Sequence, residues 1–258
     1  MIRFWQALDE RLGHVEPTWW GAVVTAPAFP AVWDANYARV DMPAGDLTLA
    51  EVTEALAPAL ARVGTDVFHV VSFHAEDTTG LLSELSSRGH RLTWDLVMEH
   101  DLGGSRAASG APVEELEPDG ALWERVEASM ALFGIEPALA AQLRELEIVA
   151  HATSGKRWFG VRNDAGAIVS LAALAVLEGV GYLDNVVTFP EGRRKGFASA
   201  TAARVLAEAR TVGADRVFLL ADPDARPVVD LYERLGFNRD GWIASTRGPA
   251  TAPGEVNR

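Results

Sequence analysis

The residues best suited to chemistry lie in one stretch of the C-terminal half, 186–198, with the sequence Val-Val-Thr-Phe-Pro-Glu-Gly-Arg-Arg-Lys-Gly-Phe-Ala. An apolar strand here runs into a proline, a charged turn and a helix that Gly196 opens. Backbone N–H groups at the start of a helix lack a partner within it, and the helix dipole adds partial positive charge. Arg193, Arg194 and Lys195 bring cationic side chains to the same place. This arrangement predicts a cradle for a pyrophosphate group.

The spacing Arg193-x-x-Gly196-x-Ala198, in its strand–turn–helix context, resembles the acyl-CoA signature of the GNAT N-acetyltransferase superfamily. A second match follows at Asp230-Leu-Tyr-Glu-Arg-Leu-Gly-Phe237, which ends a predicted helix and enters a predicted strand, as the family's closing motif does. The resemblance covers about residues 113–246. It implies acetyl-CoA as co-substrate and direct attack on its acetyl group by a primary amine within a ternary complex.

The resemblance also assigns residues to the cofactor. The backbone of 186–188 would hydrogen-bond the pantetheine arm where two parallel strands splay, and the amides of 193–198 would hold the pyrophosphate. Where the family often has an asparagine, seven residues before the helix tyrosine, this sequence has Ala225, and the adjacent Asp224 is the candidate substitute. The cofactor-binding residues implied are Val186, Val187, Thr188, Arg193, Arg194, Lys195, Gly196, Phe197, Ala198 and Asp224.

Two residues are candidates for catalysis. By resemblance, Tyr232 would give a proton to the departing thiolate, and a phenol of pKa about 10 is still protonated at neutral pH. Asp184, which is predicted to share a strand face with Tyr182, Val186 and Thr188, is the candidate base, either directly or through an ordered water. The alternative for Tyr232 is a core tyrosine at a helix end, and for Asp184 a carboxylate with no direct role.

Composition limits the classes of molecule that the protein can be expected to bind. A formal net charge of −13 opposes binding to nucleic acid or to an anionic membrane surface, and it suits an amine acceptor, either a small molecule or a peptide. The sequence has no cysteine, so thiolate catalysis and disulfides are excluded. The six histidines show no metal-ligand spacing, and no metal is expected. The N-terminus lacks the apolar core of a signal peptide, and we expect a cytoplasmic protein. Monomer and homodimer remain open.

A small, polar stretch at 105–112 is the predicted linker between an N-terminal domain, 1–104, and a C-terminal domain, 113–248, with a tail at 249–258. In the C-terminal domain, the patterns predict strands at 113–117, 157–162, 167–177, 180–188, 216–220 and 237–245, and helices at 119–133, 136–148, 196–212 and 225–235. In the N-terminal domain they predict helices at 49–63 and 79–88 and strands at 67–73 and 91–100.

The N-terminal order of helix, strand, helix, strand repeats the last four elements of the C-terminal domain, which indicates an internal duplication. The predicted fold class is α/β, with a mixed, mostly antiparallel sheet flanked by helices in two GNAT-like halves. The N-terminal half has no counterpart of the cationic turn, because the anionic sequence Asp-Met-Pro-Ala-Gly-Asp stands at 41–46. It is therefore predicted to be a degenerate half that acts as a scaffold or shapes the acceptor site.

Two other functions stay open at this point. The same fold can serve a different acyl group or acceptor, since a tandem arrangement with one silent half is similar to that of mycothiol synthases. The chain can also be a non-catalytic acyl-CoA-binding module that acts through protein contacts. Loss of turnover with retained CoA binding in Tyr232→Phe separates an enzyme from such a module.

Overall fold

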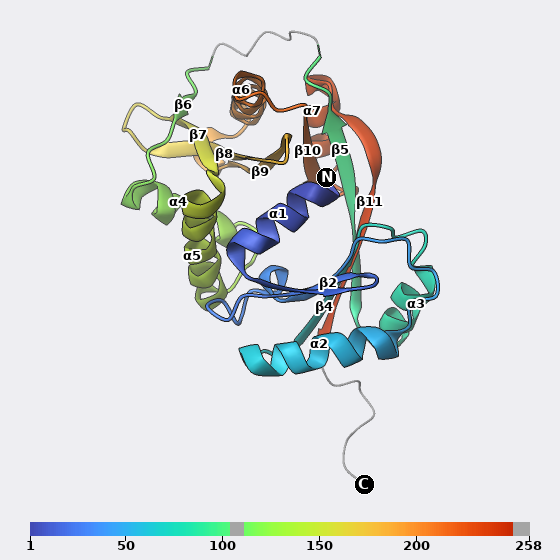
Figure 1. Ribbon diagram of the computed structural model, residues 1–258. Coiled ribbons are helices and arrows are strands. Elements are labelled where there is room, and N and C mark those ends of the chain that lie inside the picture. Colours follow the sequence, from blue (N-terminus) through green and yellow to red (C-terminus); the bar gives the residue numbers. More distant parts are fainter. Residues whose placement is uncertain (104–110, 250–258) are drawn as a thin grey trace. The chain divides into compact units, whose positions relative to one another are not determined.

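The computed structural model describes residues 1–103 and 111–249 (Figure 1). The chain forms two compact units. Among the described residues, the C-terminal unit contains Met1, Arg3–Leu8 and the chain between Val97 and Asp240, and the N-terminal unit contains Ile2, Asp9–Leu96 and residues 241–249. Most of the predicted linker, 105–110, and nearly all of the predicted tail, 250–258, lie outside the described residues.

The units depart from the predicted boundaries because three elements contribute residues to both of them: helix α1 (Ile2–Leu12) and strands β5 (Arg91–His100) and β11 (Asn238–Pro249). The two strands have 10 and 12 residues, about twice the usual length of a strand. The second part of β11 pairs antiparallel with β4 (Val67–Ser72), and so the end of the chain completes the N-terminal sheet.

The C-terminal unit orders its strands β5-β10-β9-β8-β7-β6. Neighbours from β6 to β9 are antiparallel, and β9 and β10 are parallel. Its strands, besides the second part of β5, are β6 (Glu114–Glu115), β7 (Arg157–Arg162), β8 (Ile168–Leu177), β9 (Val180–Thr188) and β10 (Arg216–Ala221). Its helices are α4 (Gly120–Ala131), α5 (Pro137–Ser154), α6 (Phe197–Thr211) and α7 (Arg226–Leu235), with a short 3-10 helix η2 (Pro190–Gly192).

Helices cover both faces of this sheet. Figure 1 shows α6 on one side of β7, β8 and β9, and α4 and α5 on the other. On the α4–α5 side, Leu122 and Val126 of α4 pack with Trp158, Leu171 and other buried residues of the strands. Because both faces are covered, β8 is buried along almost its whole length, as its uninterrupted apolar sequence predicts.

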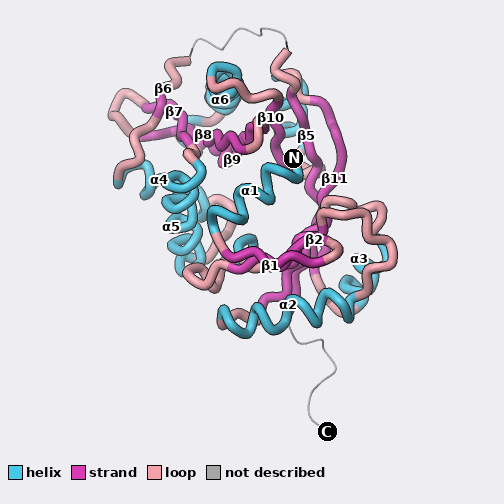
Figure 2. The backbone as a smooth tube through the Cα atoms, in the orientation of Figure 1, coloured by secondary structure: helices cyan, strands magenta, loops and turns pink. Residues whose placement is uncertain are grey.

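The chain begins with elements that the sequence patterns did not predict (Figure 2). They are α1, which both units share, and, in the N-terminal unit, β1 (His14–Thr18), β2 (Gly21–Thr25), the 3-10 helix η1 (Trp33–Ala35) and β3 (Tyr37–Val40). The strands of this unit follow the order β1-β2-β3-β4-β11-β5. The pairs β1–β2, β2–β3 and β4–β11 are antiparallel, and β3 and β4 are parallel. The predicted fold class, a mixed and mostly antiparallel sheet flanked by helices, is confirmed.

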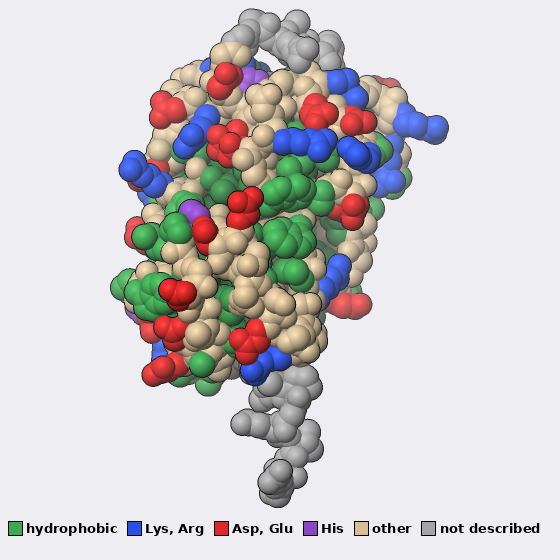
Figure 3. All heavy atoms as spheres, turned by 90° about the vertical axis from the view of Figure 1, so that its right-hand side faces the viewer, with side chains coloured by type: hydrophobic (Ala, Val, Ile, Leu, Met, Phe, Trp, Pro, Cys, Tyr) green, Lys and Arg blue, Asp and Glu red, His purple; other side chains and the backbone are tan. Residues whose placement is uncertain are grey.

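Charges of both signs share the surface. On the face that Figure 3 shows, Lys and Arg side chains stand beside Asp and Glu, with apolar side chains between them. The net charge of −13 therefore does not form one continuous acidic surface there.

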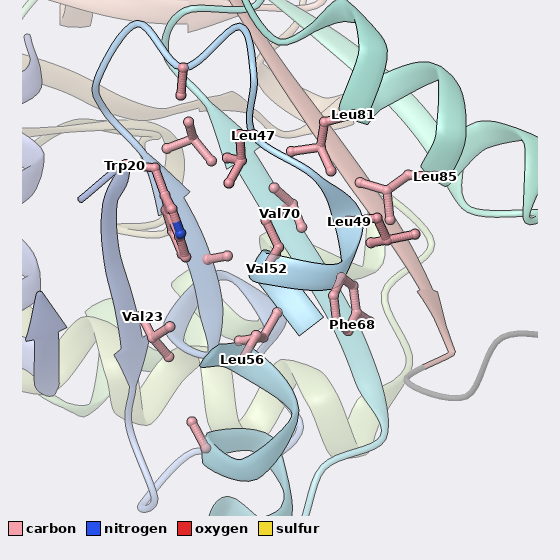
Figure 4. Packing of buried hydrophobic residues seen from close by; sticks show 14 of the residues in the cluster. Trp20, Val23, Leu47, Leu49, Val52, Leu56, Phe68, Val70, Leu81 and Leu85 are labelled. Atoms are coloured by element: carbon pink, nitrogen blue, oxygen red, sulfur yellow. The ribbon is translucent and has the colours of Figure 1, made fainter. Parts of the chain in front are cut away.

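The core of the N-terminal unit lies between its sheet and helices α2 (Leu49–Val63) and α3 (Thr79–Ser87). Figure 4 shows Val52 and Leu56 of α2 facing Phe68 and Val70 of β4, with Trp20 beside them. A capping box formed by Thr48 and Glu51 starts α2, and Gly64 ends the helix in the left-handed conformation. This unit thus has a hydrophobic core of its own.

Candidate active site

Strands β9 and β10 separate at the place where the candidate cofactor residues begin. Their parallel ladder joins Val180 to Arg216, Gly181 to Val217 and Tyr182 to Phe218. It covers the first three residues of β9, while the strand continues to Thr188. On this side the Thr188 carbonyl oxygen accepts a hydrogen bond from Arg193 Nε at 3.3 Å, and the part of β9 before it is open to a chain that adds as a strand.

The loop after β9 is anchored at its start. The Phe189 N–H donates to the Val169 carbonyl oxygen at 3.0 Å, and the Gly192 N–H donates to the Phe189 carbonyl oxygen at 2.8 Å. Gly192 is buried against β8, and a Cβ there would lie 2.7 Å from the Val169 carbonyl oxygen. Arg125 of α4 stacks over the Phe189 ring at 3.5 Å and pairs with Glu191 at 2.5 Å. Sequence reasoning missed Arg125, because its contacts are distant along the chain.

The second half of the loop faces solvent. Residues 193–196 are all exposed, and Arg194 and Gly196 have left-handed φ values of 61° and 77°. The Arg193 N–H donates to the Pro190 carbonyl oxygen at 3.3 Å, which removes one of the amides expected to bind a ligand. Within the described residues, the N–H groups of 194–198 have no backbone acceptor. Five amides at the start of α6 therefore remain available beside three cationic side chains, and this set fits a diphosphate.

A β-bulge in β9 corrects the predicted arrangement of side chains. Asp184 pairs with Ala173 and Val187 with Leu171, so two residues of β9 stand opposite the single residue Ala172. Asn185, inside the bulge, has φ 51°. The extra residue reverses the alternation of faces after it.

The prediction that Asp184 shares a face with Tyr182, Val186 and Thr188 is therefore wrong for the last two residues. Tyr182 and Asp184, opposite Ala175 and Ala173, share a face with the core on the α4–α5 side. Thr188 lies on the other face, where its hydroxyl is 3.0 Å from that of Ser170. Val186 is half-buried, and Val187 is buried in the core on the α4–α5 side.

Asp184 belongs to a charged cluster that sequence reasoning did not find. The Lys156 Nζ lies 2.6 Å from Asp184 Oδ2 and 2.7 Å from Glu147 Oε2 of α5. The Asn185 side chain donates to Glu147 at 2.9 Å and to Asp184 at 3.2 Å. Burial alone would lower the pKa of Lys156, but the charges of Asp184 and Glu147 outweigh burial and raise it well above its ordinary value. Lys156 is thus a fully charged ammonium within the protein.

Tyr232 lies on α7, which Gly236 ends in the left-handed conformation. The side chain is buried, and its ring packs edge-to-face on Phe237 with 5.7 Å between centroids. Burial raises the pKa of the Tyr232 phenol, and the charge of Asp184 raises it further. The two candidate catalytic residues therefore interact electrostatically, and the phenol stays protonated over the physiological pH range.

Asp224 lies in the turn before α7. Its N–H donates to Asp222 Oδ1 at 2.8 Å, and its side chain is exposed. The neighbouring Ala225 is the residue before the first of α7. Nothing in this turn gives Asp224 a defined orientation toward a ligand.

The corresponding region of the N-terminal unit is built differently. The parallel ladder of β3 and β4 pairs Ala38 to Val70 and extends to Val40, the last residue of β3. The loop that follows begins with Asp41, which is buried and accepts a hydrogen bond from Arg39 Nε at 2.9 Å. This unit therefore has neither a separated strand end nor a cationic loop at the matching place.

No helix in the described part of the chain is long and apolar enough to cross a membrane. No group of three or more His, Asp or Glu side chains in residues 1–103 and 111–249 is arranged to hold a metal ion.

Residues 122–237 match the sequence model of the Acetyltransferase (GNAT) family. Over 76 residues, the chain is 37% identical to the uncharacterized N-acetyltransferase YobR of Bacillus subtilis (strain 168). This match spans 29% of the present chain and 30% of that relative's length.

Two solved structures extend the likeness beyond this domain. A GCN5-related N-acetyltransferase from Kribbella flavida superposes with a TM-score of 0.60 over 99% of this chain and 96% of that one, at 19% identity. A tandem GNAT protein from the clavulanic acid biosynthesis pathway superposes with a TM-score of 0.54 over 78% of this chain and 68% of that one, at 14% identity. At these identities the likeness shows the fold.

Proposed function

We infer that this protein, whose residues 122–237 form a domain of the GNAT acetyltransferase family, is an acetyl-CoA-dependent N-acetyltransferase that acts on a primary amine. The observation that carries this inference is the loop between β9 and α6, with the free amides of 194–198 beside Arg193, Arg194 and Lys195. Those groups suit a diphosphate, and the open edge of β9 leads directly to them.

The residues that would bind acetyl-CoA divide into two sets. The far part of β9, 186–188, would pair with the amide groups of the pantetheine arm. The N–H groups of 194–198 would donate hydrogen bonds to the diphosphate at the start of α6, and Arg193 and Arg194 would screen its charge. Bound acetyl-CoA supplies the acetyl group as a thioester.

Tyr232 and Asp184 would each take part in one proton transfer, Tyr232 as the donor and Asp184 as the acceptor. As the amine nitrogen forms a bond to the carbonyl carbon and the carbon–sulfur bond breaks, Tyr232 would give its proton to the sulfur. Asp184 would receive the proton that the amine loses, either directly or through a water. The Lys156 Nζ, 2.6 Å from Asp184 Oδ2, would hold this carboxylate in place.

We further propose that the N-terminal unit is a degenerate domain of the same fold. It repeats an antiparallel run of strands, β1 to β3, joined to a parallel neighbour, β4, as β7 to β9 are joined to β10. Its role would be to support the acceptor side of the reaction, with a small-molecule amine or a peptide as partner.

The test combines calorimetric titration of CoA with a thiol-release assay on acetyl-CoA across a panel of amines. We expect Arg193→Ala to raise the Kd for CoA about tenfold or more, the loss of one charge-assisted contact. Arg88→Ala, which removes an exposed arginine of the N-terminal unit, is the matched control and should leave the Kd unchanged.

Tyr232→Phe should keep CoA binding and reduce kcat by about 10²–10⁴-fold. CoA binding without turnover on any amine would favour the non-catalytic module. No CoA binding by the unmodified protein would overturn the proposal.

A further inference from the structure

Asn185 stands in the bulge of β9 with a left-handed backbone, at φ 51°. Asparagine adopts this conformation at a lower cost than most residues that carry a side chain. Glycine would adopt it still more easily, so the backbone alone does not require asparagine at this position. The contacts of the Asn185 side chain indicate a second role.

Both hydrogens of the Asn185 side-chain amide are used. Nδ2 donates to Glu147 Oε1 at 2.9 Å and to Asp184 Oδ2 at 3.2 Å, and an amide nitrogen carries two hydrogens. The other oxygen of Glu147 accepts from Lys156 Nζ, which also donates to Asp184. Helix α5 is therefore joined to the bulge by two separate contacts, one through Asn185 and one through Lys156.

These contacts occupy the two oxygens of Asp184 unequally. Oδ2 accepts from Lys156 Nζ at 2.6 Å and also from Asn185 Nδ2. Among the described residues, Oδ1 accepts from the Asn185 backbone N–H alone, at 2.8 Å. A carboxylate oxygen can accept about two hydrogen bonds. The open position of Asp184 is therefore on Oδ1, and the side chain as a whole is 25% exposed.

We propose that Asn185 and Glu147 are positioning residues, which hold Asp184 so that its Oδ1 takes a proton from an acceptor that binds as an ammonium ion. This inference rests on the proposed acetyl transfer. Asp184 takes one proton before the nitrogen attacks and releases it to solvent afterwards. The second proton that the nitrogen loses replaces the one that Tyr232 gives to the sulfur, so one proton is released for each acetyl group transferred.

The pH dependence of the rate separates this role from a purely structural one. A primary alkylamine has a pKa near that of a lysine side chain, about 10.4, so below about pH 9 it is almost entirely an ammonium ion. If Asp184 takes the proton within the site, kcat/KM for the amine should change by less than about threefold between pH 7 and 9. If Asp184 is misplaced, only the neutral amine reacts, and its fraction increases about tenfold per pH unit.

The test variant is Asn185→Gly, because glycine keeps the left-handed backbone and removes both side-chain contacts. The assay measures thiol release from acetyl-CoA with the primary alkylamine that the unmodified protein acetylates fastest. A misplacement of about 1 Å can lower a rate about 10²-fold, so we expect a loss of about this size in kcat/KM at pH 7 that becomes smaller toward pH 9. Glu147→Ala, which removes the anchor on α5, should show the same pH dependence. Calorimetric titration of CoA gives the active fraction of each variant, and the Kd should stay within about twofold.

The matched control is Asn163→Gly in the turn between β7 and β8, where Asn163 Oδ1 accepts from the N–H groups of Ala165 and Ala167 at 3.1 and 3.0 Å. This substitution also removes two side-chain hydrogen bonds, and it should leave the pH profile unchanged. The inference alone is overturned if Asn185→Gly loses nothing or loses the same factor at every pH. It is also overturned if kcat/KM of the unmodified protein itself rises about tenfold per pH unit, because the acceptor would then bind as the neutral amine. If the unmodified protein acetylates no amine, the proposed function and this inference are both wrong.

Discussion

Replacing Lys156 with methionine removes the cation that joins Glu147 and Asp184 while keeping a side chain of similar length. At an effective dielectric of about 20, each contact, at 2.6 and 2.7 Å, has a Coulomb energy of about 6 kcal/mol. Burial of the ions opposes much of this gain. The loss of one partner from a buried ion pair costs about 3–5 kcal/mol. Lys156 is only 6% exposed, but the carboxylates are 18% and 25% exposed and can regain water. We therefore expect Lys156→Met to lower the free energy of unfolding by about 3 kcal/mol.

Urea denaturation followed by intrinsic fluorescence measures this cost. The double variant Glu147→Gln/Lys156→Met leaves a single carboxylate and should recover about half of the lost stability. If Lys156→Met lowers the free energy of unfolding by less than 1 kcal/mol, the cluster is not a buried ion pair and the reasoning fails.

Chemical labelling checks the same cluster in the unmodified protein. Lys156 and Lys195 are the two lysines of the sequence. Lys195 is exposed, whereas Lys156 is buried and held in its protonated form. An amine-reactive reagent should therefore modify Lys195 and should reach Lys156 only after unfolding. Equal labelling of both lysines in the native protein would contradict the structure.

Three further outcomes follow from other residues. Gly192→Ala places a Cβ 2.7 Å from a backbone carbonyl of β8, so it should cost about 1–3 kcal/mol of stability and raise the Kd for CoA about tenfold in calorimetry. Burial lowers the pKa of His100, whose Nδ1 accepts a hydrogen bond from the Leu102 N–H, so below about pH 6.5 the unfolded chain binds a proton that the folded chain does not. The free energy of unfolding should therefore be highest above about pH 6.5 and fall below it by up to about 1.4 kcal/mol per pH unit. Urea denaturation should show a flatter slope in His100→Gln but not in the control variant His14→Gln, which replaces an exposed histidine. Because the pKa of Tyr232 is raised, kcat in the thiol-release assay should not decline between pH 8 and 10, and a decline there would argue against this residue as the proton donor.

Much of the fold could be predicted because its signals are local. Strands β7 and β9 and helix α2 have the predicted bounds, since each is a strongly patterned apolar segment between turn residues. Strands β1 to β3 were missed because they have only four or five residues each, too few to show a period. Pro17 also argues against a strand, although β1 is the edge strand, where proline is tolerated.

Part of the candidate site could be proposed from the sequence because its signal is also local. The loop at 189–198 carries its chemistry in consecutive residues, so its sequence reveals cationic side chains and a helix start together. The partners of Asp184 come from α5 and from the residue before β7, and nothing local indicates them. The bulge at Asn185 was hidden too, because only pairing with β8 reveals the extra residue that reverses the faces.

The two parallel strand pairs indicate why a repeated strand order need not repeat a function. Strand β9 continues for six residues beyond its last pair with β10, so its backbone groups on that side need another partner, which a bound ligand can provide. Strand β3 ends where its ladder ends, and the Phe73 N–H donates to the Val40 carbonyl oxygen at 3.0 Å, which closes the gap. A ligand there would have to displace a backbone hydrogen bond and meet the buried carboxylate of Asp41. The N-terminal unit should therefore bind no CoA, and CoA should bind with a stoichiometry of one per chain.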